Sequence, residues 1–548
     1  MELRSHNDRN QMLGIFEAAR IVPRPDHDQV IDVRKLHLGP NVAINYAQPL
    51  QIVKGKGCYL YDQNGVEYLD CVNNVAHVGH CHPEVTAAVC EQLQTLNTNS
   101  RYLHPNLTMY IKELLQTLPP ALETLYFGNS GSEANDLALR VALEARPGAT
   151  HVAVLAGAYH GHVESLIGFS PYKFWGKGGR GKPKNVHVMP CPDPYRGLNL
   201  DGRRCARAVL EAARQAGGRI CAFYCESILS CGGQIVPPEG WLKDVFDELR
   251  KEGVICISDE VQCGFGRVGE TFWAFQSQGV CPDMVSIGKS IANGYPVSTL
   301  AMTRKLAQDF SRAGMQYFNT FGAGTAACAA ALATLRVVKE EKLQEHAAQV
   351  GPYLQSELRK IQEDFAMIGD VRGLGLMMGI EVVQCKKSKV VAPRLATWIL
   401  ERMKARRILM STDGPYDNVL KIKPPMMFGR KEVDTLVSNL RAVLSVELTP
   451  SVFDKILIEE QKHAIDIVHP RKAIYDENER RLYAGLLAAD HYGHLSSSGA
   501  AAATSPAGFA RPLPQHSMNL LEAPMQRHTV EIESLSEAAA SQPPMSRL

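Results

Sequence analysis

The sequence predicts an α/β protein whose large domain holds a mostly parallel β-sheet between layers of helices. Four short and almost continuously apolar runs indicate buried strands: HVAVLAG at 151–157, ICAFYCES at 220–227, VICISDE at 254–260 and DMVSIGK at 283–289. Amphipathic runs such as ANDLALRVALEA and GWLKDVFDELRKEG lie between them and are typical of helices. Strands that are apolar on both faces and separated by helices form parallel sheets covered on both sides.

The pattern changes on the C-terminal side of these strands. Residues 331–448 contain long helical runs that enclose the strand-like segments LGLMMGIEVV and NVLKIKPP, which predicts a second, smaller α/β domain. After about residue 487 the composition shifts to low-complexity stretches such as SSSGAAAATSPAGFARPLPQ. Such a segment buries little apolar surface, so we expect it to be disordered and to take no part in the chemistry.

Composition narrows the class of partner. The chain has 548 residues, with 59 Lys and Arg against 57 Asp and Glu, so no overall charge favours nucleic acid or an acidic membrane. There is no apolar run of roughly 18 or more residues that would predict a membrane span. We therefore expect a small-molecule partner. Fourteen cysteines scattered through apolar runs predict a reducing, intracellular compartment, and the acidic residues in MELRSHNDRN favour the cytosol.

Ionisable side chains follow three of the predicted strands. Glu226 follows AFYC, Asp259 and Glu260 follow VICIS, and Lys289 follows DMVSIG. Parallel sheets bind ligands beyond the carboxyl ends of their strands, which is where these groups would converge. Each of them alone is better explained as a helix cap or a surface turn residue. The hypothesis of a site therefore depends on their convergence.

The segment NSGSEAND at 129–136 adds a candidate anion site. Ser130, Gly131 and Ser132 precede an amphipathic run and offer hydroxyls and free backbone N–H groups at a helix N-terminus. The alternative is that Ser132 only caps the helix. A phosphate cradle, a carboxylate and a strand-end lysine together match the needs of pyridoxal 5′-phosphate (PLP): a phosphate anchor, a partner for the pyridine nitrogen and an amine for the aldehyde.

Over roughly 33–448 the sequence resembles the class III aminotransferases, a branch of the fold-type I PLP enzymes. The resemblance runs in order through NSGSEAND, AYHGH at 158–162, SDEVQCGFGRVG at 258–269, IGKSIANGYPV at 287–297 and VRGLGL at 371–376. Within that family the sequence is most similar to the phospho-lyase branch, whose members act on ethanolamine phosphate or 5-phosphohydroxylysine. Segments such as NNVAHVGHCHP, SPYKF and STDGPYDNVLKIKPPM carry this closer similarity.

The resemblance implies a fold-type I architecture in which N- and C-terminal segments build the smaller domain. It divides the chain into an N-terminal segment, the first part of the small domain, the large PLP-binding domain, the second part of the small domain and a C-terminal extension: 1–32, 33–95, 96–330, 331–448 and 449–548. It also implies a homodimer or homotetramer. Because some members of the family are mitochondrial, the resemblance leaves the mitochondrion open beside the cytosol.

Four roles in cofactor binding and catalysis follow from the resemblance. Lys289 would hold PLP covalently and, once a substrate amine displaces it, act as the base at the carbon that bears the amine. Asp259 would keep the pyridine nitrogen protonated, because a nearby anion favours the cationic ring. Tyr159 would stack on the ring, and Gln262 would lie near the phenolic oxygen.

The anionic groups of the cofactor and of the substrate have their own implied partners. Gly131 and Ser132 would hold the PLP phosphate, which Thr320 of YFNTFG would also reach from the neighbouring subunit. Arg372 of the RGxGL motif would bind an anionic part of the substrate, carboxylate or phosphate, since its planar fork suits either group. A glutamate in the position of Glu226 pairs with this arginine when a substrate carboxylate is absent.

Two other motifs have a structural explanation. His77, His80, Cys81 and His82 in HVGHCHP form a compact group without a second ligand set at zinc-site spacing, so we expect no metal. The segment GFGR at 264–267 lacks the full G-x-G-x-x-G pattern before a helix. We expect it to be a turn near the cofactor.

The sequence departs from the family pattern after YFNTFG. The family usually continues with a second glycine, then Asn or Ser, then Pro, whereas this chain reads AGTAACAA at 323–330. Thr320 is retained, but the turn that follows must differ because the fixed φ of proline is lost. This puts the geometry of the subunit interface in question and leaves Lys289 and Asp259 in place.

The implied chemistry allows two reactions with one first step. After proton removal, a phosphate on the neighbouring carbon is eliminated, which gives an aldehyde, ammonia and phosphate; phosphoethanolamine and 5-phosphohydroxy-L-lysine both carry this arrangement. Without that phosphate, the same residues perform transamination, as in an ω-aminotransferase of the alanine–glyoxylate type. A third hypothesis, based on the altered turn and the long C-terminal extension, is an impaired homologue that acts as an interaction protein.

Overall fold

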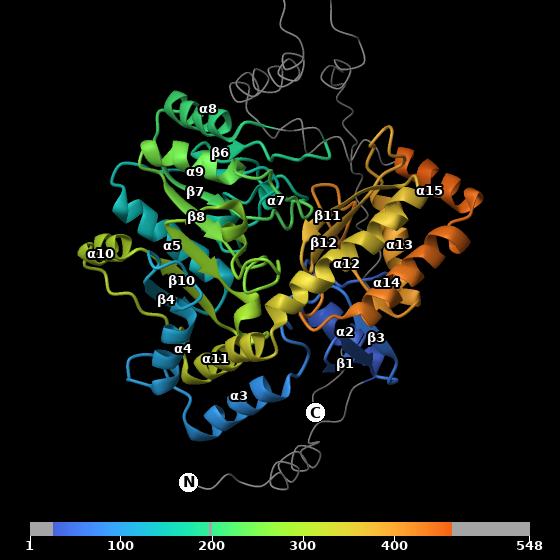
Figure 1. Ribbon diagram of the computed structural model, residues 1–548, viewed down its shortest axis with the longest axis horizontal. Helices are drawn as coiled ribbons and strands as arrows, with labels where there is room; N and C mark the ends of the chain where they lie inside the picture. Colours follow the sequence, from blue (N-terminus) through green and yellow to red (C-terminus); the bar gives the residue numbers. More distant parts are fainter. Residues whose placement is uncertain (1–25, 197–199, 463–548) are drawn as a thin grey trace, which may run out of the picture. The chain divides into compact units, whose positions relative to one another are not determined.

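The apolar runs of the sequence are strands of one seven-stranded sheet (Figure 1). The computed structural model describes residues 26–196 and 200–462, so the tail expected to be disordered after about residue 487 lies outside the described residues. The strand order is β4-β10-β9-β8-β7-β5-β6. The strands are β4 (Thr124–Gly128), β5 (His151–Leu155), β6 (Val186–Met189), β7 (Ile220–Cys225), β8 (Ile255–Asp259), β9 (Met284–Ile287) and β10 (Ser298–Met302).

The direction of these strands confirms the predicted fold class. β6, β5, β7, β8 and β9 are parallel neighbours, while β10 runs antiparallel to both β9 and β4. The parallel part contains all four runs that the sequence identified as buried strands. The mostly parallel sheet between helices is therefore confirmed.

Each face of the sheet has its own apolar core, because successive side chains of a strand point to opposite faces. In β5, Val152 and Val154 belong to one core and Ala153 and Leu155 to the other. Helices α5 (Gly131–Ala145) and α10 (Arg304–Arg312) supply the first core, and α8 (Gly202–Gln215) and α9 (Trp241–Lys251) supply the second.

The other helices precede, connect and follow the strands. They are α2 (His27–His37), α3 (Pro83–Thr95), α4 (Pro105–Leu115), α6 (Glu164–Ile167), α7 (Pro171–Phe174), α11 (Thr325–Glu340), α12 (Leu343–Asp364), α13 (Pro393–Ala405), α14 (Arg430–Ala442) and α15 (Pro450–Lys462), with short helices η1 (Ala274–Gln278), η2 (Lys289–Ala292) and η3 (Val443–Glu447). In the part of the chain that the structure describes, no helix is long and apolar enough to cross a membrane.

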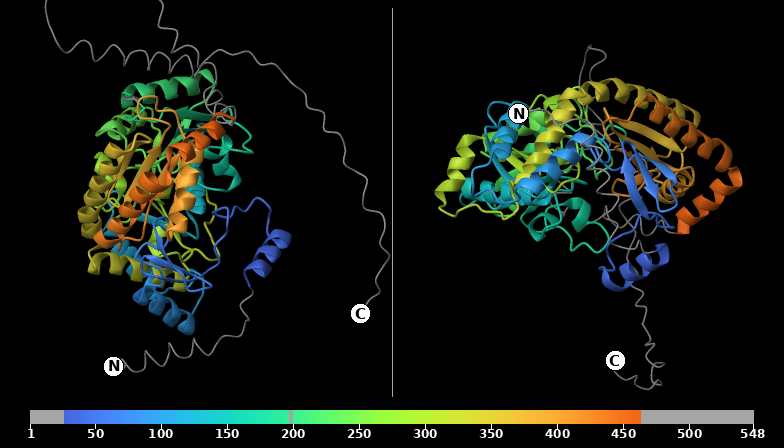
Figure 2. Two further views of the ribbon diagram at one scale, coloured as in Figure 1. Left: turned by 90° about the vertical axis from the view of Figure 1, so that its right-hand side faces the viewer. Right: turned by 90° about the horizontal axis from the view of Figure 1, so that it is seen from below.

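Two smaller sheets contain the remaining strands. An antiparallel sheet of order β11-β12-β15-β14 consists of β11 (Ile368–Leu374), β12 (Met377–Val382), β14 (Ser411–Asp413) and β15 (Val419–Ile422). The other sheet has the order β1-β2-β3-β13, with β1 (Ile52–Lys56), β2 (Tyr59–Asp62), β3 (Glu67–Asp70) and β13 (Ile408–Leu409). Because β13 pairs with β3, N- and C-terminal segments share one sheet (Figure 2). The exact domain boundaries stay a prediction.

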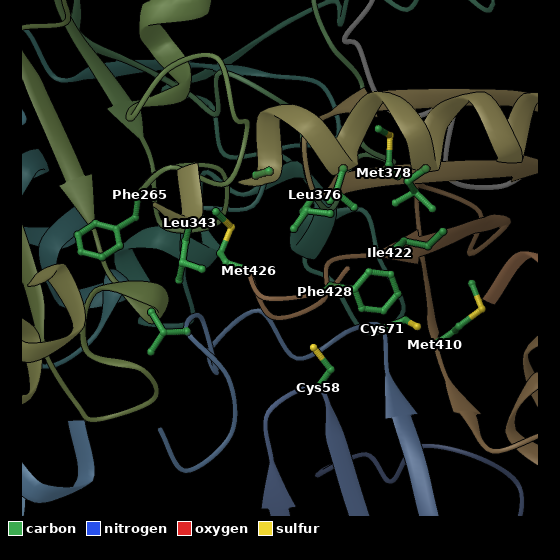
Figure 3. Packing of buried hydrophobic residues seen from close by; sticks show 14 of the residues in the cluster. Cys58, Cys71, Phe265, Leu343, Leu376, Met378, Met410, Ile422, Met426 and Phe428 are labelled. Carbon is green, nitrogen blue, oxygen red and sulfur yellow. The ribbon is translucent and has the colours of Figure 1, made fainter. Parts of the chain in front are cut away.

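The largest apolar core also joins segments that are far apart in sequence. Figure 3 shows Cys58 and Cys71 near Phe428, with Phe265 and Leu343 further along the same cluster. All of these side chains are at most 4% exposed. The cluster therefore ties N-terminal residues, the loop after β8 and the C-terminal half into one packed unit.

Arg267 makes a polar connection inside this packed region. Its guanidinium donates to the carbonyl of Leu376 at 3.1 Å, to the carbonyl of Pro424 at 2.7 Å and to Nδ1 of His77 at 3.2 Å. The side chain is fully buried, and burial lowers the pKa of Arg267 to about 10. The GFGR segment is a turn, as expected, and its arginine links three distant parts of the chain.

The histidines of HVGHCHP have separate partners. His77 donates through Nε2 to the carbonyl of Phe265 at 2.7 Å, and burial lowers its pKa. His80 lies 2.6 Å from the carboxylate of Asp70, and His82 lies 3.0 Å from that of Glu341. Within residues 26–196 and 200–462, no group of three or more His, Cys, Asp or Glu side chains could hold a metal ion.

We predict that Arg267→Met lowers the free energy of unfolding by about 2–4 kcal/mol, because two buried carbonyls and the His77 ring lose their donor. The loss is measured as a shift of the urea midpoint. Arg304→Met is the matched control, since Arg304 is mostly exposed and pairs with Glu123 at the surface; its effect should stay within about 1 kcal/mol. Equal shifts in the two variants would contradict the role assigned to Arg267.

Candidate active site

The carboxyl ends of β7, β8 and β9 open onto a cavity of about 330 Å³, a size that suits a small molecule. The predicted site residues that line it are Gly131, Ser132, Tyr159, Glu226, Asp259, Gln262 and Lys289. The strand register explains why they meet: Cys225 is paired with Ser258, and Asp259 with Ser286. The residues that follow these strands therefore reach the same edge of the sheet.

Asp259 is a buried carboxylate with three hydrogen-bond donors. It accepts from Nδ2 of Asn135 at 2.8 Å, from Nδ1 of His160 at 3.0 Å and from the backbone N–H of Val261 at 3.1 Å. Among the described residues, no lysine or arginine forms an ion pair with it. A carboxylate at 4% exposure beside a cavity is a suitable partner for a cationic ring nitrogen.

Asn135 and His160 belong to the motifs NSGSEAND and AYHGH, and the sequence analysis predicted no role for either side chain. Asn135 projects from α5 and also donates to the carbonyl of His160 at 2.8 Å. The sequence could have indicated a role for Asn135, because an asparagine at a core position of an amphipathic helix needs buried hydrogen-bond partners. The contact of His160 with Asp259 depends on the folding of the loop after β5, which sequence spacing does not describe.

Lys289 lies at the first position of η2, two residues after β9, and lines the cavity. Its φ of +45° is in the left-handed region, which costs a residue with a side chain about 1–2 kcal/mol. Gly288 precedes it, and a Cβ there would lie 3.2 Å from the backbone nitrogen of Gly131. The lysine therefore sits where strand β9 and the start of α5 approach closely, and the strained backbone is typical of a functional position.

The sequence predicts an anion site at the start of α5, and this helix start lines the cavity. Ser130 is the N-cap: its hydroxyl accepts from the N–H of Glu133 at 3.2 Å, so the alternative that Ser132 caps the helix is wrong. Gly131 and Ser132 are the first helical residues, whose N–H groups have no partner within a helix. A Cβ on Gly131 would lie 2.8 Å from the Val261 side chain, so only glycine fits at this position without a shift of Val261.

Tyr159 and Glu226 are linked at the other side of the cavity. The backbone N–H of Tyr159 donates to Glu226 at 3.3 Å, and the Tyr159 ring contacts that of Tyr172 edge-on, with 6.1 Å between centroids. Glu226 also accepts from the backbone N–H of Ser230 at 3.2 Å and from its hydroxyl. Burial, followed by the charge of Asp259, raises the pKa of Glu226.

Arg372 does not pair with Glu226 in this structure, contrary to the pairing that the resemblance suggested. Its guanidinium donates to Asp370 at 3.0 Å, to Glu381 at 2.6 Å and to the carbonyl of Gly233 at 2.7 Å. Asp370 and Glu381 lie on the same antiparallel sheet as Arg372, and their carboxylates pair with its guanidinium. Arg372 lines a second cavity of about 720 Å³. Its role in binding a substrate anion stays a prediction.

Gln262 accepts a hydrogen bond from Lys423, a residue to which the sequence analysis assigned no role. Its Oε1 accepts from Nζ of Lys423 at 3.1 Å and from Nδ2 of Asn74 at 3.2 Å. Because both donors act on the oxygen, the amide group is oriented with its NH2 in the other direction, where it lies 3.6 Å from Sγ of Cys231. Lys423 is fully buried, and burial lowers its pKa to about 8. The strand-like segment NVLKIKPP contains two lysines, Lys421 and Lys423, and these were the feature of the sequence that could have indicated a buried cation.

Thr320 is exposed and lies outside the cavity of its own chain. In the turn after it, Ala323 has a φ of +57°, a conformation that favours glycine; the predicted difference from the family's turn stays a prediction. Helix α11 then begins at Thr325, whose hydroxyl donates to the carbonyl of Leu96 at 2.6 Å. This hydrogen bond connects the start of α11 to the end of α3, in a chain that lacks the proline of the family pattern.

A model of the aminotransferase class-III family matches residues 42–444. The chain is 45% identical over 430 residues to the alanine–glyoxylate aminotransferase 2-like protein of Drosophila melanogaster, covering 76% of this chain and 87% of that protein. It is 40% identical over 440 residues to ethanolamine-phosphate phospho-lyase homolog 1 of Caenorhabditis elegans, covering 76% and 94%. Mitochondrial forms occur among the other relatives.

A solved structure agrees with these relatives. The structure of an Arthrobacter phospholyase in complex with phosphoethanolamine superposes with a TM-score of 0.73 at 36% identity, covering 76% of this chain and 99% of that one. The fold and the site thus define a fold-type I PLP enzyme. This chain belongs to the class III aminotransferase family, which includes relatives named as aminotransferases and as phospho-lyases.

We predict that Asp259→Asn leaves the fold intact and lowers turnover by about 100-fold or more, because a neutral amide no longer favours a protonated ring nitrogen. Circular dichroism checks the fold, and steady-state kinetics of the PLP-loaded protein check the turnover. Asp201→Asn is the control: Asp201 caps α8 with its side chain, and asparagine caps a helix equally well. Turnover near that of the wild type in Asp259→Asn would refute the assignment.

Proposed function

We propose that this enzyme is a PLP-dependent phospho-lyase that eliminates phosphate from a phosphorylated terminal amine. The products are an aldehyde, ammonia and inorganic phosphate, and the candidate substrates are phosphoethanolamine and 5-phosphohydroxy-L-lysine. The observation that carries the proposal is the similarity to the Arthrobacter phospholyase bound to phosphoethanolamine, over nearly the whole of that chain. The C. elegans phospho-lyase homologue supports the same reaction.

The residues of the cavity fit PLP. Lys289 would hold it covalently, Asp259 would face the ring nitrogen, and the open cradle at Gly131 and Ser132 would take the phosphate. Tyr159 would lie against the ring. When bound, PLP supplies an electron sink that stabilises negative charge on the carbon next to the substrate nitrogen.

The side-chain amide of Gln262 has a defined orientation in this arrangement. Lys423 and Asn74 both donate to its oxygen, and one N–H of its NH2 group is directed at Sγ of Cys231, so the second N–H would donate to the phenolic oxygen of the cofactor. Burial of Lys423 lowers its pKa to about 8 without removing its ability to donate, since a neutral amine still carries N–H groups. The amide orientation would therefore persist on both sides of that pKa.

Lys289 would carry out the proton transfer. Freed by the substrate amine, it removes a proton from the carbon that bears the amine. The carbon–oxygen bond on the neighbouring carbon then breaks, the electron pair leaves with phosphate, and a carbon–carbon double bond forms. Water hydrolyses the unsaturated amine to an aldehyde and ammonia, so one water is consumed for each phosphate released.

A class III ω-aminotransferase is the second candidate, and the Drosophila relative named as alanine–glyoxylate aminotransferase 2-like favours it. It would use the same lysine and aspartate, because both reactions begin with removal of the same proton. The two reactions differ in their need for a second substrate: transamination requires a keto acid to accept the amino group, and elimination does not.

The first test of the proposal is turnover without a keto acid. Incubated with phosphoethanolamine or 5-phosphohydroxylysine alone, the PLP-loaded enzyme should release phosphate and ammonia in equal amounts over many turnovers. A colorimetric phosphate assay and an enzymatic ammonia assay measure the ratio. Sustained turnover that depends on pyruvate, glyoxylate or 2-oxoglutarate and releases no phosphate would make the aminotransferase correct.

Lys289→Ala is the control for this measurement. It should lose turnover and the visible absorption band of the lysine-bound cofactor, while Lys305→Ala, a change at an exposed lysine of α10 that pairs with Asp309, should keep both. A wild-type protein without such a band after addition of PLP would favour the remaining hypothesis, an interaction protein.

The proposal includes assembly into at least a homodimer, with a homotetramer as the larger form. Large apolar side chains are exposed around the loop before α4 and the loop before α11: Tyr102 at 69%, Leu103 at 104% and Phe321 at 74%. Apolar groups gathered in this way favour a protein partner. Thr320 precedes Phe321, so an interface at these loops would place it beside another subunit.

Paired variants test whether Thr320 acts across that interface. Thr320→Asp should inactivate by repelling the cofactor phosphate, and Lys289→Ala is inactive because it lacks the base. In a mixed dimer, the site with intact Lys289 would receive Thr320 from the Lys289→Ala subunit. A refolded equal mixture should therefore recover about a quarter of wild-type activity, because half the dimers are mixed and each has one complete site. No recovery in mixed dimers, or an active monomer on sedimentation, would overturn the proposal.

A further inference from the structure

A second cavity, of about 720 Å³, lies next to the first. Tyr172 lines it, and the ring of Tyr172 contacts that of Tyr159, which lines the first cavity. The contact between these two rings therefore connects the linings of the two cavities. A substrate with its amine at Lys289 would extend past Tyr159 toward the second cavity.

Lys173 lies beside these two tyrosine rings. Its Nζ lies 5.6 Å from the centroid of the Tyr159 ring and 5.4 Å from that of Tyr172, and the residue lines the second cavity. These cation–π contacts hold the ammonium near the rings without neutralising its charge. Its side chain is partly buried, so a charge held here is less screened than one on the open surface.

The other cations of the second cavity differ from Lys173. Arg372 pairs with Asp370 and Glu381, and Arg196 also pairs with Glu381. Lys177, which also lines the cavity, is exposed, whereas Lys173 is partly buried against the two tyrosine rings. Lys173 has no carboxylate within ion-pair distance in the described ranges 26–196 and 200–462. Its charge therefore stays available to an anion from outside the protein.

The backbone fixes Lys173 relative to the first cavity. Helix α7, which contains it, is held by the N–H of Tyr172, which donates to the carbonyl of Ala158 at 3.1 Å. The hydroxyl of Ser170 accepts from the N–H of His160 at 3.0 Å, and His160 in turn contacts Asp259. The lysine is thus connected through two hydrogen bonds to the loop that carries Tyr159.

We propose that Lys173 binds the phosphate group of the substrate and stays with it as it leaves. The inference rests on the proposed function, since it requires a phosphorylated amine. The compact charge of an ammonium suits a phosphate dianion, and its three donors reach several phosphate oxygens. When the carbon–oxygen bond breaks, the electron pair and the new negative charge pass to the phosphate oxygen, which Lys173 stabilises, while Lys289 holds the proton removed from carbon.

Lys173→Met tests the proposal, because methionine keeps much of the apolar stem and removes the charge. We expect kcat/KM for phosphoethanolamine to fall about tenfold or more, as for loss of a charged hydrogen bond. Inorganic phosphate should inhibit the wild-type enzyme competitively and inhibit the variant at least about tenfold less strongly. The absorption band of bound PLP should be unchanged.

Two further variants make the test specific. Lys173→Arg, which restores a cation, should recover a large part of both the kcat/KM and the inhibition by phosphate. Lys184→Met removes the same charge from an exposed lysine that lines neither cavity, and should leave both at wild-type values. An effect of Lys184→Met equal to that of Lys173→Met would reduce the role of Lys173 to a general surface charge and overturn the proposal.

The measurements separate this inference from the proposed function. If the wild-type enzyme only transaminates, the phospho-lyase proposal fails, and phosphate inhibition of transamination still reports whether Lys173 binds that group. Wild-type values of kcat/KM and of phosphate inhibition in Lys173→Met would overturn the inference while elimination stands. An equal loss with a phosphorylated and an unphosphorylated amine would also overturn it, since the residue would then support the fold of the site.

Discussion

The carboxylate of Asp259 is buried at the end of a parallel strand, and its three donors organise the surrounding site. Asn135 brings in α5, His160 brings in the loop after β5, and the N–H of Val261 fixes the turn after β8. A charge buried without a lysine or arginine costs free energy unless hydrogen bonds or a bound cation offset it. The elements that hold the carboxylate also carry the anion cradle and Tyr159, so satisfying this one group sets the shape of the cavity.

A second set of interactions connects this site to the C-terminal half of the chain. Lys423 follows β15 and reaches Gln262 in the loop after β8, while Arg267 in the same loop donates to the carbonyls of Leu376 and Pro424. Both cations are fully buried, where an unsatisfied charge is costly, and several contacts hold each of them. A shift of the C-terminal sheets relative to the central sheet would break these bonds, so the orientation of the Gln262 amide depends on how the halves pack.

The sequence predicted those parts of the fold and site that depend on local patterns. Buried strands appear as apolar runs, and the residue after a parallel strand lies at the ligand-binding edge, so Glu226, Asp259 and Lys289 could be placed together. The sequence did not correctly predict where α5 starts or which partners Arg372 has. Ser130 rather than Ser132 caps α5 because the helix begins at Gly131, three residues before the amphipathic run that starts at Ala134. Arg372 meets Glu381 because β11 and β12 form a hairpin. The role of Lys423 depends on a loop about 160 residues away in sequence.

Elimination and transamination share their first step, and this limits where the choice between them can be made. In the proposed function, Lys289 and Asp259 would serve removal of the same proton in both reactions, so neither residue would favour one outcome. The outcomes diverge at the neighbouring carbon, where only a leaving group that is bound and stabilised can depart. Lys173, which we propose to bind the leaving phosphate, lines the second cavity together with Tyr172, whose ring contacts that of Tyr159. Under that proposal, the choice between elimination and transamination depends on residues at the entrance of the second cavity rather than on the groups that would hold the cofactor.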